Sequence, residues 1–235
     1  MPYLKFISDK DLIAAVDRVV KIIKTAEQNS AINLHKNVID PFSALFDGVS
    51  HSITYKQWLA QEKVRQIQKT MQNAIGDFHQ CILGSIPGWT NLGVGGGLDV
   101  MNKKMKIIAE IKNKHNTTKG DHAVKLYDSI ESKLNADEYK NFTGYYVEII
   151  PKGRKQYDKP YTPSDNNKKE KRPLNERIRV IDGISFYAMA TGRESAMQEL
   201  FEAIQRILED KYKHKLGRSE AGQYFDLFSR AFPIK

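Results

Sequence analysis

The fold of this 235-residue chain is decided by the stretch Gly97-Leu98-Asp99-Val100-Met101-Asn102-Lys103-Lys104-Met105-Lys106-Ile107-Ile108-Ala109-Glu110-Ile111-Lys112. Its pattern predicts two strands, near residues 97–102 and 105–113, joined by a polar turn. Asp99 and Glu110 lie almost equally far from that turn, so antiparallel pairing would place them roughly opposite each other, with Cβ atoms about 4.5–5.5 Å apart. Glu110 and Lys112 are two residues apart on one strand and therefore share a face.

This arrangement of two carboxylates and a lysine indicates a metal-dependent site. Carboxylates at such a distance repel each other, and a neighbouring lysine offsets that repulsion only in part. A hard divalent cation such as Mg²⁺ would resolve it, because it prefers carboxylate oxygens and keeps several waters. Lys112 could then hold or deprotonate a water molecule. The residues around Glu110 are apolar, which argues that Glu110 and Lys112 are not simply solvent-exposed surface charges.

The net charge of +9 is concentrated in two short segments. Residues 101–119 carry +5 and residues 152–179 carry +6, so the remainder of the chain carries −2. A charge run is usually a solvated face, but these two border the Asp99–Lys112 stretch, which favours a surface for a polyanion. The one cysteine, Cys81, excludes an internal disulfide and a multi-cysteine zinc site. No apolar run of about 18 residues and no signal peptide is present, so we expect a cytoplasmic protein without a membrane partner.

The rest of the chain predicts an α/β protein with a mixed central sheet flanked by helices. Expected helices and strands surround the hairpin: helices at 9–27, 56–83, 121–134 and 194–213, and strands at 142–150 and from 178 onward, the last turning at Asp182-Gly183. Residues 151–175 hold four prolines and many lysines and read as a long loop. We expect one domain, 1–235, with four parts: a helical N-terminal part at 1–55, a catalytic core at 56–150, a basic loop at 151–180, and a C-terminal strand and helix at 181–235.

Asp99 followed by Glu110-Ile111-Lys112 resembles the signature of PD-(D/E)XK nucleases, with Leu98 where the name of the motif has proline. The succession of helix, hairpin, helix and strand resembles the core of that superfamily. More particular stretches resemble the type II restriction endonucleases that cut GGNCC- or GGWCC-type sites: Glu62–Lys69, Gly76–Gln80, Glu110–Thr117 and Pro160–Asn166. The resemblance covers roughly residues 55–205.

The resemblance implies a restriction-endonuclease-like fold that hydrolyses double-stranded DNA at a short palindrome with Mg²⁺ and leaves 5′-phosphate ends. Asp99 and Glu110 would be metal ligands, and Lys112 would orient the attacking water. Glu62 is a further candidate ligand. The alternative, a solvated glutamate paired with a nearby lysine or arginine, is an equally good interpretation. A homodimer would match the palindrome. A prokaryotic host would also need a cognate DNA methyltransferase, with which no stable complex is expected.

The two basic segments are then candidates for contacts with DNA. Residues after the catalytic strand would meet phosphates or a groove, and those of the basic loop would read bases, since Arg and Lys suit guanine in the major groove. The candidates are Lys114, His115, Asn116, Thr117, Arg154, Lys155, Asp165, Asn166, Asn167, Lys168, Lys169, Arg172, Arg177 and Arg179.

Two alternatives remain open from the residues alone. One is a PD-(D/E)XK nuclease of repair or recombination that cuts structured or unspecific DNA. The other is a basic DNA-binding module without catalysis, which predicts salt-sensitive binding and no cleavage.

Overall fold

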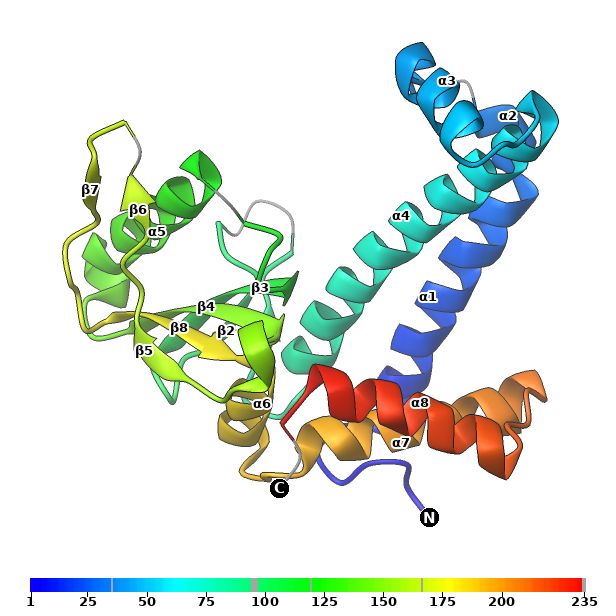
Figure 1. Ribbon diagram of the computed structural model, residues 1–235. Coiled ribbons are helices and arrows are strands. Elements are labelled where there is room, and N and C mark those ends of the chain that lie inside the picture. Colours follow the sequence, from blue (N-terminus) through cyan, green and yellow to red (C-terminus); the bar gives the residue numbers. More distant parts are fainter. Residues whose placement is uncertain (35, 94–96, 119, 166, 234–235) are drawn as a thin grey trace. The chain divides into compact units, whose positions relative to one another are not determined.

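The computed structural model describes residues 1–34, 36–93, 97–118, 120–165 and 167–233 (Figure 1). The chain forms two compact units. Unit 1 consists of Met1–Ile13 and His79–Lys235, and unit 2 consists of Ala14–Phe78. The expectation of a single endonuclease domain stays a prediction. None of the helices in the described ranges combines the length and apolarity needed to cross a bilayer.

Unit 1 is built on a six-stranded mixed sheet with the order β1-β2-β3-β4-β8-β5. The central pairs, β3–β4 and β4–β8, are parallel, and the outer pairs are antiparallel. The strands are β1 (Thr90–Asn91), β2 (Val100–Asn102), β3 (Ile107–Lys114), β4 (Thr143–Ile150), β8 (Ile178–Asp182) and β5 (Asp158–Pro160). The predicted mixed α/β class with helices around a mixed sheet is confirmed.

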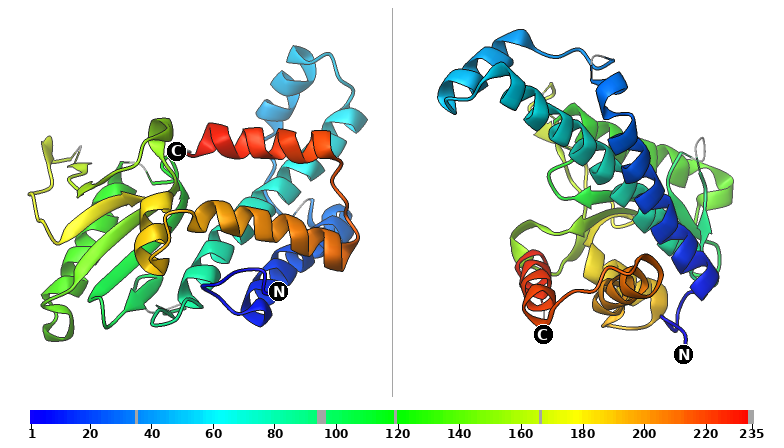
Figure 2. Two further views of the ribbon diagram at one scale, coloured as in Figure 1. Left: turned by 90° about the horizontal axis from the view of Figure 1, so that it is seen from below. Right: turned by 90° about the vertical axis from the view of Figure 1, so that its right-hand side faces the viewer.

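Helices cover both faces of this sheet (Figures 1 and 2). On one face, α5 (Asp121–Asn135) packs Tyr127, Ile130 and Leu134 against β3, β4 and β8. On the other face, Phe186 of α6 (Gly183–Thr191) packs edge-on against Tyr145 of β4. Because side chains alternate along a strand, the even-numbered residues of β3 and β4 point toward α5. Glu110 and Lys112 therefore belong to the α5 face.

The predicted long loop after β4 is wrong in part. Residues 151–180 contain a short 3-10 helix (Lys152–Arg154) and β5, which pairs with β8. They also contain a small hairpin of β6 (Ser164–Asp165) and β7 (Glu170–Lys171). Strands of two or three residues leave too little periodicity for the sequence to reveal.

The predicted C-terminal strand and helix also need correction. The strand from residue 178 ends at Asp182, because the Asp182 side chain accepts a hydrogen bond from the Ser185 N–H (3.0 Å) and caps α6. Two helices follow α6: α7 (Ala196–Tyr212), which the sequence predicted, and α8 (Arg218–Ala231), which it did not.

Unit 2 is helical. It holds α2 (Ser30–Asn33), α3 (Pro41–Ser50), and most of α1 (Asp9–Gln28) and α4 (Tyr55–Gly84), two helices that reach into unit 1. Within unit 2, α1 and α4 lie side by side (Figures 1 and 2), and an ion pair of 3.8 Å joins Arg18 to Asp77. Prolines, glycines and short helices made the segment between α1 and α4 hard to predict.

Candidate active site

Asp99 is fixed beside β3 by hydrogen bonds of its backbone and side chain. Its N–H donates to the Ala109 carbonyl (2.9 Å), and its own carbonyl accepts from the Leu92 N–H (2.8 Å). Its carboxylate Oδ2 accepts from the Ile111 N–H (2.7 Å). A hydrogen bond to a carboxylate is roughly twice as strong as a neutral one. The Asp99 side chain is therefore held at Ile111, the residue between Glu110 and Lys112 in β3.

The register of the hairpin agrees with the sequence analysis. Val100 pairs with Ala109, and Met101 with Ile108. This is the register that the sequence predicts, and it ends at Val100. Asp99 directly precedes β2 and its N–H bonds to Ala109, so its place opposite Glu110 stays a prediction. The register depends on the apolar residues, because a slip of one position would turn the buried Ile108 and Ile111 to the wrong faces.

Glu110 and Lys112 form an ion pair on the surface of the sheet. The Lys112 Nζ lies 2.6 Å from the Glu110 Oε1, and the two side chains are 36% and 16% exposed. Their β3 neighbours Ala109 and Ile111 are buried. A partly dry environment strengthens the pair, and Lys112 neutralises one of the two carboxylates.

Sequence reasoning missed Glu148, which lies next to Lys112 on the adjacent strand. The two residues are register partners in the parallel β3–β4 pair, so their side chains share the α5 face. The Tyr157 hydroxyl donates a hydrogen bond to the Glu148 carboxylate. Burial, followed by this hydrogen bond, raises the pKa of Tyr157 above its ordinary value, so the hydroxyl stays protonated and keeps donating. The available signal was that Glu148 is the one charged residue in Thr143–Ile150.

The chemistry of these residues fits a magnesium ion. Within the described ranges, no group of three or more His, Cys, Asp and Glu side chains is arranged to hold a metal. Mg²⁺ does not require such a cage, because it is commonly bound through one or two carboxylates, its own waters and substrate phosphates. Asp99, directly before β2, and Glu110, in the middle of β3, provide two carboxylates for such an ion.

Comparison of the whole sequence with known proteins identifies the family of this chain. The model of the Eco47II restriction endonuclease family matches residues 4–212. The chain belongs to this family. It is 38% identical to the type II restriction enzyme Eco47II of Escherichia coli, over 93% of this chain and 92% of that enzyme. It is 36% identical to the type II restriction enzyme Sau96I of Staphylococcus aureus, over 98% of this chain and 88% of that enzyme.

Membership in the Eco47II restriction endonuclease family confirms the prediction of a type II restriction endonuclease, a site-specific deoxyribonuclease. It also favours this reading over the two alternatives, a repair nuclease and a basic module without catalysis. The roles of individual residues stay predictions.

In this family member, the candidate DNA contacts after β3 lie where that strand ends. Lys114, Asn116 and Thr117 are exposed, and the Thr117 hydroxyl donates to the Lys114 carbonyl (2.7 Å), which shapes the turn. His115 is half-buried, and its N–H donates to the Ile150 carbonyl (3.1 Å) at the end of β4.

Four candidates of the basic segment have partners within the chain: Asp165, Arg172, Arg177 and Arg179. Arg172 pairs with Asp128 (2.7 Å), and its second partner is the buried Asp165 (3.6 Å). Asp165 also accepts hydrogen bonds from the backbone N–H groups of Asn167 and Lys168.

The other two, Arg177 and Arg179, also bind groups of the chain itself. Arg177 donates to the Lys140 carbonyl (2.7 Å), and Arg179 pairs with Asp158 (2.6 Å) and Glu176 (3.2 Å). A guanidinium with such partners is less available to a base, so these residues are weaker candidates for readout.

The remaining candidates of this segment are exposed, except Asn166, which lies outside the described residues. They are Arg154, Lys155, Asn167, Lys168 and Lys169. Of these, Lys155 lines a cavity of about 620 Å³, whose lining also includes Glu148, Tyr157, Tyr161, Lys152 and Lys159. The cavity reaches Glu148 and therefore extends from the row of side chains that contains Lys112.

Glu62, the candidate ligand from the long helix, lies in unit 2. It pairs with Arg65 (3.0 Å) and accepts a hydrogen bond from Gln66 (2.9 Å). The pairing agrees with the alternative interpretation of Glu62 as a paired glutamate, although its side chain is only 18% exposed, and its role as a ligand stays a prediction.

Proposed function

We propose that this enzyme hydrolyses one phosphodiester bond in each strand of a short G/C-rich palindrome of the GGNCC type, with Mg²⁺ as cofactor and as a homodimer. The single observation that supports the catalytic part is that β3 holds all three candidate residues: the Ile111 N–H binds the Asp99 carboxylate (2.7 Å), and Lys112 pairs with Glu110 (2.6 Å). The site type follows from the resemblance of particular stretches, such as Glu110–Thr117, to enzymes that cut such sequences.

Asp99 and Glu110 would hold the magnesium ion. Bound there, the ion would lower the pKa of a water molecule and stabilise negative charge on the phosphate. Lys112 would place its ammonium beside the reacting phosphate, where it orients the attacking water and offsets developing charge. The water oxygen adds to phosphorus and the bond to the 3′ oxygen breaks, which leaves a 5′-phosphate and a 3′-hydroxyl.

The exposed cations would position the DNA. We infer that Lys114 contacts the backbone together with Asn116 and Thr117, and that the exposed residues of 154–169 approach bases. Phosphate contacts fix the register of the protein on the duplex, and base contacts specify the sequence. We further infer action in the cytoplasm of a prokaryote, where a cognate methyltransferase would protect the host's own sites.

A digest of one plasmid of known sequence tests this function. The wild-type enzyme with Mg²⁺ is expected to give discrete bands, whereas Asp99→Ala is expected to bind the same DNA and leave it uncut. A smear of fragments would favour a nuclease without a fixed site. Cleavage by Asp99→Ala at the wild-type rate would contradict the assignment of the active site.

A further inference from the structure

Helix α3 (Pro41–Ser50) exposes an apolar stripe. Phe42, Leu45, Phe46 and Val49 follow the spacing i, i+3, i+4, i+7 and therefore lie on one face. They are 70%, 69%, 73% and 80% exposed, and no residue of α3 is buried. A stripe with this spacing usually packs against another element, so α3 has the pattern of an interface without a partner in the same unit.

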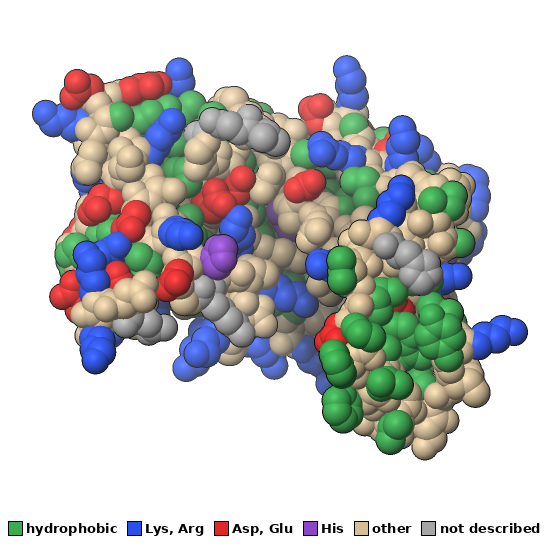
Figure 3. Space-filling model, turned by 90° about the horizontal axis from the view of Figure 1, so that it is seen from above, with side chains coloured by type: hydrophobic (Ala, Val, Ile, Leu, Met, Phe, Trp, Pro, Cys, Tyr) green, Lys and Arg blue, Asp and Glu red, His purple; other side chains and the backbone are tan. Residues whose placement is uncertain are grey.

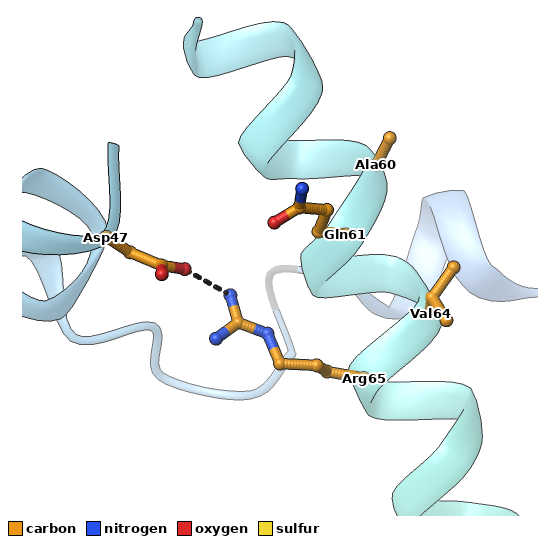
Figure 4. A pocket seen from close by; sticks show the side chains of 5 residues that line it. All are labelled: Asp47, Ala60, Gln61, Val64 and Arg65. Carbon is orange, nitrogen blue, oxygen red and sulfur yellow. Dashed lines mark ion pairs between the residues drawn. The ribbon is translucent and has the colours of Figure 1, made fainter. Parts of the chain in front are cut away.

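The opposite side of α3 is attached to α4. Asp47, the one charged residue of α3, accepts a hydrogen bond from the indole of Trp58 (3.0 Å) and lies 3.3 Å from the guanidinium of Arg65 (Figure 4). The Asp40 side chain caps the start of the helix by accepting from the Phe42 N–H (2.9 Å). These polar contacts hold α3 with its charged side toward its own chain and its apolar side toward solvent.

Exposed apolar side chains gather in this part of the chain. Of the thirteen large hydrophobic residues exposed in the described ranges, eight lie in unit 2: the four of the stripe with Ile32, Val38, Tyr55 and Val64. Figure 3 shows hydrophobic side chains clustered on the surface of this unit. At roughly 100–150 Å² each, the eight present on the order of 1,000 Å². The four residues of the stripe contribute about half of that area, so an interface with the roughly 800 Å² per partner that is standard would also take in neighbouring members of the eight.

A cavity of about 450 Å³ lies between α3 and α4 (Figure 4). Ala60 and Val64 of α4 provide apolar walls, and the Asp47–Arg65 ion pair closes one side. An apolar side chain from a second molecule could enter this cavity while the stripe itself is covered.

We propose that the stripe of α3 and the adjoining cavity form the twofold interface with a second copy of this chain. The proposal deepens the proposed function, because a palindromic site calls for two active sites related by a twofold axis. The chemistry of α3 opposes other occupants. The helix has no Lys or Arg for DNA phosphates or for an anionic membrane surface. An uncharged stripe can face its own copy without like-charge repulsion, as an isologous interface requires.

Sedimentation of the full-length protein tests this interface. The wild type is expected to have the mass of two chains, and Leu45→Glu and Val49→Glu are expected to have the mass of one chain, with dimer affinity lowered on the order of 100-fold or more. Both positions are exposed, so circular dichroism should confirm unchanged folding. The matched control is Leu227→Glu on α8, where the leucine is 62% exposed and a dimer should persist.

A charge-swap mixture tests whether the surface faces itself. Leu45→Glu and Leu45→Lys should each be monomeric and should recover the two-chain mass when mixed. The proposal is overturned if the wild type is a single chain with and without its DNA, or if both glutamate variants still sediment as dimers. Plasmid cleavage, measured in parallel, reports on the proposed function separately: a wild type that cuts DNA while both glutamate variants stay dimeric refutes the interface alone.

Discussion

The substitution Lys112→Met separates the proposed catalytic role of this lysine from its contribution to stability. Methionine keeps most of the side-chain volume and removes the ammonium that lies 2.6 Å from Glu110. Lys112 is about one-third exposed, so solvent screens the pair and its loss should cost no more than about 1 kcal/mol of folding free energy. The variant should therefore be folded.

The expected effect on catalysis is much larger. Removing one group that stabilises charge in a transition state typically lowers the rate by about 10²–10³-fold, equivalent to about 2.7–4 kcal/mol. The matched control is Lys114→Met, two residues further along β3 and exposed at its end. If Lys114 contacts a phosphate, its loss should weaken binding and reduce the salt dependence of binding by about one counterion, with little change in the rate of the bound complex.

Single-turnover cleavage of a short duplex at saturating enzyme measures the chemical step, and fluorescence anisotropy across a salt series measures binding. We expect Lys112→Met to lose rate and keep affinity, and Lys114→Met to do the reverse. A Lys112→Met enzyme that cuts within about threefold of the wild-type rate would refute the catalytic role inferred from the geometry.

Two further predictions concern the stability of unit 1. Burial lowers the pKa of His79 to about 4, from 6.5, so the unfolded chain binds more protons between these values; stability should fall by about 3 kcal/mol as pH drops from 6.5 to 4. In urea unfolding measured across this pH range, His79→Gln should weaken the dependence of stability on pH, and an unchanged dependence would contradict the low pKa of His79. Asp182→Ala removes the cap of α6 and the acceptor of the Tyr157 N–H, so unfolding free energy should fall by about 2–4 kcal/mol; a loss below about 0.5 kcal/mol would be inconsistent with these bonds.

The hairpin was the part of the fold that local sequence could predict. The polar turn and the spacing of Asp99 and Glu110 around it fixed which residues pair, and the period of two fixed the face shared by Glu110 and Lys112. Both rules operate within sixteen residues, so no long-range information was needed.

Glu148 and the arginines could not be predicted in the same way. The place of Glu148 beside Lys112 depends on a parallel pairing between strands separated by a helix, and such a register is not encoded locally. A free cation and a paired one look identical in sequence. Arg172 and Arg179 lie in a basic segment, yet their carboxylate partners Asp128 and Asp158 show that part of this charge serves the fold.

The repulsion expected between the carboxylates of the candidate site, Asp99 and Glu110, is reduced in the structure. From the sequence, a metal ion was needed to relieve it. In the structure, the chain itself provides part of that relief, because the Ile111 N–H binds Asp99 and the Lys112 ammonium binds Glu110. Each carboxylate is thus oriented by β3, the strand that also carries the lysine. If DNA is cleaved here as proposed, we expect little rearrangement of these side chains on binding, since preorganised charges are usually the largest contribution to catalysis.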